Sequence, residues 1–116
     1  MKILILGSEG FVGNNLVDGL SKNHEIYCAD MVSESNHKNY SQFNVIDSES
    51  VMKTVQNVDV VIDLVAHSLV SSIEGPTKNA EVNIIGLLNI LEACRINNIK
   101  KLIFTSASSL VGEPKT

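Results

Sequence analysis

A glycine-rich turn directly follows an apolar run at the start of the chain, and this combination constrains the fold more than any other feature. The run Lys2–Leu6 is apolar without alternation, which is typical of a parallel strand buried on both faces. Gly7, Gly10 and Gly13 interrupt the run, and Phe11–Leu20 then carries apolar residues at helical spacing. A buried strand, a tight turn and a helix in this order predict the first unit of a parallel α/β sheet.

Strand-like and helix-like segments alternate along the rest of the chain. Further strands are expected at Glu25–Ala29, Gln42–Val45, Asp59–Val65 and Lys101–Thr105. Helices are expected after an N-cap at Asp47 or Ser48 and from Asn79 to Asn97, with a polar loop at Met31–Ser41 and a turn at Gly75-Pro76. Parallel strands joined by right-handed helical crossovers predict a doubly wound α/β sheet, formed as one domain by residues 1–116.

Composition excludes several classes of function. The formal net charge of −4 gives no general surface for nucleic acid, so a phosphate-bearing ligand needs a local site. No apolar run approaches the roughly 20 residues of a membrane span, which argues against membrane partners. Cys28 and Cys94 lie far apart without neighbouring ligands, which argues against a metal site and favours a reducing cytoplasm.

The glycine turn has the chemistry of a phosphate site. Glycines allow a sharp turn, a close approach of the backbone to a pyrophosphate and close packing of the helix on the strand. The free N–H groups at the start of that helix would hold the phosphate charge. Asp30, at the end of the second strand, would accept hydrogen bonds from a ribose and repel a 2′-phosphate, which favours NAD over NADP. The alternative is an ordinary strand-to-helix connection.

The spacing of Gly7–Gly13 is G-x-x-G-x-x-G, and at this point the sequence resembles the extended short-chain dehydrogenase/reductase family. The members it resembles are the NAD-dependent epimerases and dehydratases of nucleotide sugars, with UDP-glucose 4-epimerase-like proteins as the nearest group. The resemblance continues through four later segments, Val58–Ala66, Ser72–Pro76, Glu81–Ala93 and Phe104–Lys115. It implies a Rossmann fold that binds NAD.

The resemblance also assigns cofactor-binding residues. They are Gly7, Gly10, Phe11, Val12 and Gly13 in the turn, then Asp30, Asn44, Val45, Val65, Ala66, His67 and Asn83. Asn44 stands where the family has an Asp that binds the adenine amino group, and its side-chain carbonyl keeps an acceptor. Asp63 stands where the family usually has His. The alternative for His67 is a surface residue without a role, and the alternative for Asn83 is a hydrogen bond to a neighbouring loop. Asn89 and Asn97 are expected to be solvated or capping residues.

The catalytic group that the resemblance places within this chain is the hydroxyl of Ser106. The more common register would place it at Ala107, and the usual Tyr before the glycine is Val111. The family's Tyr-x-x-x-Lys motif is absent, because neither Tyr27 nor Tyr40 is followed by Lys at that spacing. We therefore expect residues 1–116 to be a partial NAD(P)-binding domain, truncated after the fifth strand and without turnover by itself.

Three functions are compatible with these residues. The first is the NAD-binding portion of a nucleotide-sugar epimerase or dehydratase, which could form a homodimer through the outer apolar positions of the long helix. The second is a non-catalytic dinucleotide-binding or sensor protein, which Ala107 and Val111 favour. The third is an NAD(P)-dependent reductase of a small carbonyl compound.

Overall fold

The computed structural model describes residues 1–66 and 75–105, and these form a five-stranded parallel sheet in the order β3-β2-β1-β4-β5. The strands are β1 (Lys2–Leu6), β2 (Glu25–Asp30), β3 (Tyr40–Gln42), β4 (Val60–Asp63) and β5 (Lys101–Phe104). Every neighbouring pair is parallel, with β1 at the centre between β2 and β4. The chain moves outward from β1 in one direction first and then in the other.

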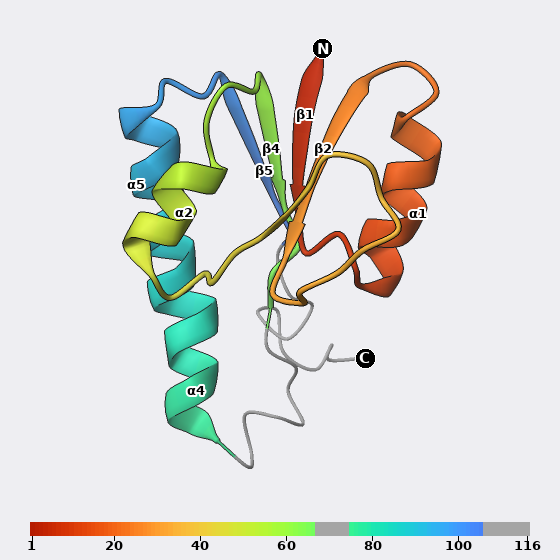
Figure 1. Ribbon diagram of the computed structural model, residues 1–116. Helices are drawn as coiled ribbons and strands as arrows, with labels where there is room; N and C mark the ends of the chain where they lie inside the picture. Colours follow the sequence, from red (N-terminus) through yellow and green to blue (C-terminus); the bar gives the residue numbers. More distant parts are fainter. Residues whose placement is uncertain (67–74, 106–116) are drawn as a thin grey trace, which may run out of the picture.

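Helices cover both faces of this sheet, as Figure 1 shows. Helix α1 (Phe11–Leu20) lies on one face, and α2 (Ser48–Thr54) and α5 (Gly86–Ile96) lie together on the other. Helix α4 (Pro76–Ala80) and a π-helical segment, η1 (Glu81–Ile85), lead directly into α5. The predicted doubly wound α/β architecture is therefore confirmed. Within the described ranges, no helix is both long enough and apolar enough to cross a bilayer.

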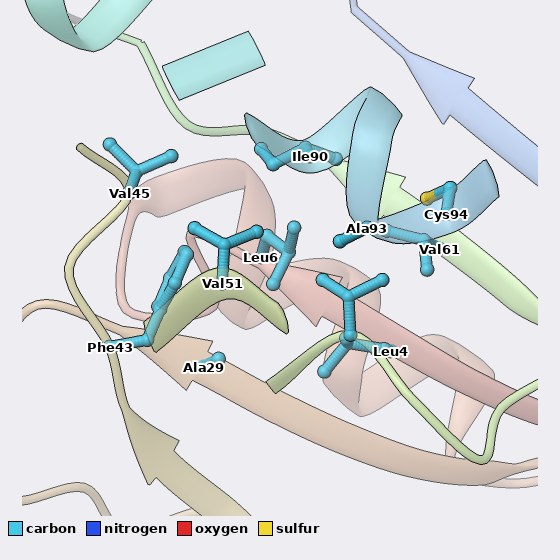
Figure 2. Packing of buried hydrophobic residues seen from close by; sticks show 11 residues of the cluster. Leu4, Leu6, Ala29, Phe43, Val45, Val51, Val61, Ile90, Ala93 and Cys94 are labelled. Carbon is cyan, nitrogen blue, oxygen red and sulfur yellow. The ribbon is translucent and has the colours of Figure 1, made fainter. Parts of the chain in front are cut away.

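Two apolar clusters hold the layers together. The cluster between the sheet and α1 contains Ile3, Ile5, Val17, Ile26, Cys28, Val60 and Ile62. The cluster on the other face, shown in Figure 2, joins Leu4, Leu6 and Val61 of the sheet to Val51 of α2 and Ile90 of α5. Alternate residues of β1 enter opposite clusters, which is why its sequence shows no polar face. Both cysteines are free and buried.

Asn89 of α5 and Asn97, the C-cap of this helix, attach it to its neighbours. Asn89 Nδ2 donates to the Val45 carbonyl oxygen at 2.9 Å, and Asn97 Nδ2 donates to that of Val55 at 2.6 Å. The prediction that both are solvated or capping residues is wrong for Asn89, and Asn97 ends α5 while also making this contact. Buried backbone carbonyl groups need hydrogen-bond donors, and the loops on either side of α2 have no neighbouring strand whose N–H groups could serve.

The third strand and the long helix differ most from their predicted boundaries, whereas the ends of β2, β4 and β5 differ by only one or two residues. The third strand is Tyr40–Gln42 instead of Gln42–Val45, because Gln42 pairs with Asp30, where β2 ends. Phe43 and Val45 follow the strand and pack in the core, only 5% and 8% exposed. The long helix begins at Pro76 instead of Asn79. Proline fits the first turn of a helix, where its missing N–H has no partner to lose.

The apolar periodicity that predicted the long helix lies mostly on its outer face. Ile85, Leu88, Leu91 and Ile96 are 46%, 55%, 45% and 47% exposed, whereas the buried residues are Gly86, Ile90, Ala93 and Cys94. This helix is therefore apolar on more than one side. Its outer face is the surface at which we expected a second copy to pair.

Gly13 lets α1 lie very close to the glycine turn. A Cβ atom at this position would lie 2.2 Å from the Gly7 carbonyl oxygen and 2.8 Å from the Ser8 Cα, so backbone atoms would have to move. At Gly19, in the same helix, a Cβ atom would meet nothing within 4 Å. The two glycines of α1 therefore have different roles.

Gly13→Ala should lower the free energy of unfolding by about 1–3 kcal/mol or more, because the added methyl group overlaps the turn. Gly19→Ala should raise it by about 0.5–1 kcal/mol, since alanine favours the helix and restricts the unfolded chain. Urea denaturation followed by circular dichroism measures both. Equal effects of the two substitutions would contradict the close packing at Gly13.

Candidate functional site

The glycine turn lies at the carboxyl end of β1 and is fixed by backbone hydrogen bonds. Gly7 has a φ of 87°, a conformation that favours glycine. The N–H groups of Gly7 and Ser8 both donate to the Ala29 carbonyl oxygen of β2, at 2.8 and 3.3 Å. Gly10 is the N-cap of α1 and has no side chain to cap it, so the first-turn N–H groups are open to an external acceptor.

Asp30 ends β2 beside this turn. Its Oδ2 accepts a hydrogen bond from the Glu9 N–H at 2.9 Å, and its Oδ1 accepts one from the Met31 N–H at 2.7 Å. These bonds fix the carboxylate against the turn while the side chain stays half-exposed. Each carboxylate oxygen can accept a further hydrogen bond, so Asp30 can still bind hydroxyl groups of a ligand.

A cavity of about 300 Å³ lies between the glycine turn, the ends of β2 and β4, and the helix that begins at Pro76. Its lining residues are Gly7, Gly10, Asp30, Met31, Phe43, Asn44, Val45, Ile46, Leu64, Val65, Ala66, Lys78 and Val82. Most of these side chains are apolar, and the polar ones are few. Such a lining is typical of a small-molecule site.

Seven of the predicted cofactor-binding residues line this one cavity. They are Gly7, Gly10, Asp30, Asn44, Val45, Val65 and Ala66. Gly13 is buried under the turn, Phe11 and Val12 are 85% and 54% exposed at the start of α1, and Asn83 is half-buried in η1. His67 and Ser106 lie outside the described residues, so their predicted roles stay predictions.

Six lining residues were not predicted as cofactor-binding, and Lys78 is the charged one among them; the others are Met31, Phe43, Ile46, Leu64 and Val82. Lys78 lies in α4, between the predicted turn at Gly75-Pro76 and the predicted start of the long helix at Asn79, and was therefore not placed near the glycine turn. Among the described residues that line the cavity, Lys78 carries the only positive charge. The signal that could have found it is Pro76, which marks the start of a helix two residues before Lys78.

Asn44 is held in place by its own segment. Its backbone N–H donates to Ser50 Oγ at 2.9 Å, and its Oδ1 accepts from the Ile46 N–H at 3.2 Å. The amide oxygen has a second lone pair, so it can also accept from a ligand. Asp47, which was expected to be a helix cap, accepts from the Glu49 N–H at 3.1 Å and caps α2.

Asp63 is a buried carboxyl group at the end of β4, only 2% exposed. Its Oδ1 accepts a hydrogen bond from the Val65 N–H at 2.9 Å, so it orients the segment that lines the cavity. Burial raises the pKa of Asp63 to about 6, and the Val65 hydrogen bond opposes this rise. Asp63 therefore positions the cavity wall and does not face the cavity itself.

The part of the chain that the structure describes contains no set of side chains suited to bind a metal ion. No group of three or more His, Cys, Asp or Glu side chains there is arranged to hold a metal ion. Burial raises the pKa of the Cys28 thiol to about 11, and the Glu9 carboxylate adds to the rise. The thiol therefore stays protonated and acts as a packing group.

Comparison with known proteins identifies the family. The model of the NAD dependent epimerase/dehydratase family matches residues 3–116, and the chain belongs to this family. A putative UDP-glucose 4-epimerase of Methanocaldococcus jannaschii is 32% identical over 97% of this chain, which spans 40% of that relative. The chain thus corresponds to about two fifths of the length of such relatives.

Solved structures agree with this assignment. The UDP-glucose 4-epimerase of Thermus thermophilus, solved in complex with NAD, is 30% identical, with a TM-score of 0.79 over 92% of this chain and 38% of its own. The UDP-N-acetylglucosamine 4-epimerase of Methanobrevibacter ruminantium, in complex with UDP-N-acetylmuramic acid, is 29% identical, with a TM-score of 0.82 over 97% of this chain and 40% of its own.

Asp63→Asn should stabilise the protein at pH 8 and have little effect at pH 4. The pKa of Asp63 in the folded protein is above its ordinary value of 3.8, so the folded protein binds the proton more tightly and loses stability as the pH rises from that value to about 6. Asparagine keeps an oxygen for the Val65 N–H and carries no charge. A pKa difference of this size corresponds to a gain of about 1–3 kcal/mol at pH 8.

Asp59, which precedes β4, is the matched control. Its Oδ2 accepts from the Lys2 N–H at 2.9 Å, and this bond holds the pKa of Asp59 below its usual value. Asp59→Asn should therefore lower stability at neutral pH, opposite in sign to Asp63→Asn. Thermal melts between pH 4 and 8 measure both, and a loss of stability at pH 8 in Asp63→Asn would contradict the assignment.

Proposed function

We propose that this chain is the NAD-binding part of a nucleotide-sugar epimerase or dehydratase. The observation that carries the proposal is the position of Asp30 and the open N-terminus of α1 at one cavity. A carboxylate for ribose hydroxyls and free N–H groups for phosphate are the two polar features that a dinucleotide needs. The family assignment supports the same conclusion.

The residues present fit NAD. The close packing at Gly13 brings the first turn of α1 to the end of β1, and Gly10 presents no side chain there, so a pyrophosphate can approach the N–H groups. Asp30 would bind the adenosine ribose, and Asn44 and Val45 would contact the adenine. Lys78 would add a positive charge toward the pyrophosphate.

The chemistry that NAD supplies in this family is the acceptance and return of a hydride. Toward that chemistry, Val65 and Ala66 form the cavity wall at the end of β4, and Asp63 holds the Val65 backbone in place. We assign His67 and Asn83 to the same side of the cofactor and Ser106 to the substrate hydroxyl, as the family resemblance implies. These three assignments remain part of the proposal.

The nucleotide-sugar substrate is proposed from the relatives. The M. ruminantium enzyme was solved with a UDP-sugar derivative, and the M. jannaschii relative is described as a putative UDP-glucose 4-epimerase. We further propose a cytoplasmic location and a homodimer that covers the exposed apolar side chains of α5. Residues 1–116 would supply the cofactor-binding domain of the whole enzyme.

Asp30→Ala should weaken NADH binding by about 1–3 kcal/mol, since it removes charge-assisted hydrogen bonds to the ribose. Asp18→Ala, which removes an exposed carboxylate from α1, should leave NADH binding unchanged. Titration of NADH and NADPH by fluorescence or calorimetry measures both variants. Equal or tighter binding of NADPH than NADH by the unsubstituted protein would overturn the role of Asp30.

Lys78→Ala should weaken NAD binding about 3–10-fold and reduce its dependence on salt, because one charge pair with the pyrophosphate is lost. Adenosine, which has no phosphate, should bind as before. Lys53→Ala in α2 is the control, since Lys53 is exposed away from this cavity. Equal loss of adenosine and NAD binding in Lys78→Ala would indicate a structural role instead.

A further inference from the structure

Helix α5 comes very close to the cavity wall at its first residue, Gly86. This glycine is buried, and a Cβ atom there would lie 2.9 Å from Val45 Cγ2 and 3.0 Å from Val45 Cγ1. Its φ of −58° and ψ of −46° are ordinary helical values, so its backbone conformation does not require glycine. The absence of a side chain at Gly86 therefore serves the contact with Val45.

The same helix also holds the backbone of Val45. Asn89 Nδ2 donates to the Val45 carbonyl oxygen at 2.9 Å. Val45 is 8% exposed within the apolar cluster that Figure 2 shows, and its β-branched side chain has few alternative rotamers. Helix α5 thus fixes Val45 in two ways, through the side chain at Gly86 and through the carbonyl group at Asn89.

Val45 and Val82 both line the cavity, and the contact at Gly86 sets the separation between them. Val82 lies in η1, which leads directly into α5, so it belongs to the same continuous helical segment as Gly86. A methyl group at Gly86 would displace Val45 or the helix that carries Val82. Either displacement would change the shape of the cavity.

This inference rests on the proposed function, in which Asn44 and Val45 contact the adenine of NAD. We infer that Gly86 and Asn89 are positioning residues for the cofactor, which act through Val45 without lining the cavity themselves. A ring that packs on an apolar wall depends on van der Waals contact, and a gap of about 0.5–1 Å loses a quarter to a half of that attraction. The affinity for the cofactor therefore depends on the exact place of Val45.

A double-mutant cycle tests the contact at Gly86. Gly86→Ala should weaken the binding of NADH and of adenosine alike, each about tenfold, because the added methyl group displaces a wall of the cavity. In a Val45→Ala background, which lacks both Cγ atoms, the added Gly86→Ala should change either affinity less than about twofold. Gly19→Ala, the same change at an open position of α1, should leave both affinities unchanged.

Asn97 provides a matched control for Asn89. Both side chains donate to a backbone carbonyl group beside α2, but the acceptor of Asn97 is Val55, which does not line the cavity. Asn89→Ala and Asn97→Ala should each lower the melting temperature, since each removes a buried hydrogen bond. Of these two variants, Asn89→Ala alone should weaken NADH and adenosine binding, about three- to tenfold. Calorimetric titrations and thermal melts measure both properties.

The outcomes separate this inference from the proposed function. Unchanged affinities in Gly86→Ala, or a loss that persists in full in the Val45→Ala background, would overturn the role of Gly86. Equal losses of affinity in Asn89→Ala and Asn97→Ala would show that the helix acts only through stability and would overturn the role of Asn89. If Gly86→Ala does not fold, the pair of asparagine variants decides the inference. No binding of NADH by the unsubstituted protein would overturn the proposed function itself, and this inference with it.

Discussion

The contact between Gly13 and the glycine turn is the constraint on which the site depends. The absence of a Cβ at Gly13 lets α1 pack directly on the Gly7 carbonyl oxygen, where any side chain would overlap backbone atoms. This contact brings the first turn of α1 to the carboxyl end of β1. The same turn donates backbone hydrogen bonds to the Ala29 carbonyl oxygen of β2. These bonds fix the position of the open N–H groups of α1 relative to the Asp30 carboxylate.

The sheet order explains why the cavity forms where it does. The chain runs from β1 to β2 and β3 on one side and to β4 and β5 on the other, so the connections diverge at the ends of β1 and β4. Open parallel sheets bind ligands at such a switch point. The lining residues Gly7 and Leu64 follow these two strands directly, and Asp63 uses a buried carboxyl group to orient the second connection.

The sequence predicts the parts of this structure that depend on local pattern. The unalternating run Lys2–Leu6 and the glycines after it were sufficient for β1, the turn and α1, and the position of Asp30 after β2 was sufficient for its place at the cavity. The third strand was misplaced because the prediction took the apolar residues Phe43 and Val45 as strand residues. They pack in the core just after the strand, and the edge strand itself is a polar segment held by backbone hydrogen bonds. Lys78 was missed because its neighbours at the cavity come from segments that are distant in sequence.

The local distribution of charge at the cavity explains how an acidic chain can bind an anionic ligand. A net charge of −4 repels phosphate at long range, so binding depends on groups within a few ångströms. The lining of the cavity includes one negative side chain, Asp30, one positive side chain, Lys78, and Gly10, the N-cap of α1. Under the proposed function, the N–H groups of α1 and Lys78 would attract the pyrophosphate, and Asp30 would disfavour a phosphate on the adenosine ribose. This uneven distribution of charge is the reason that the proposal favours NAD over a dinucleotide with a 2′-phosphate.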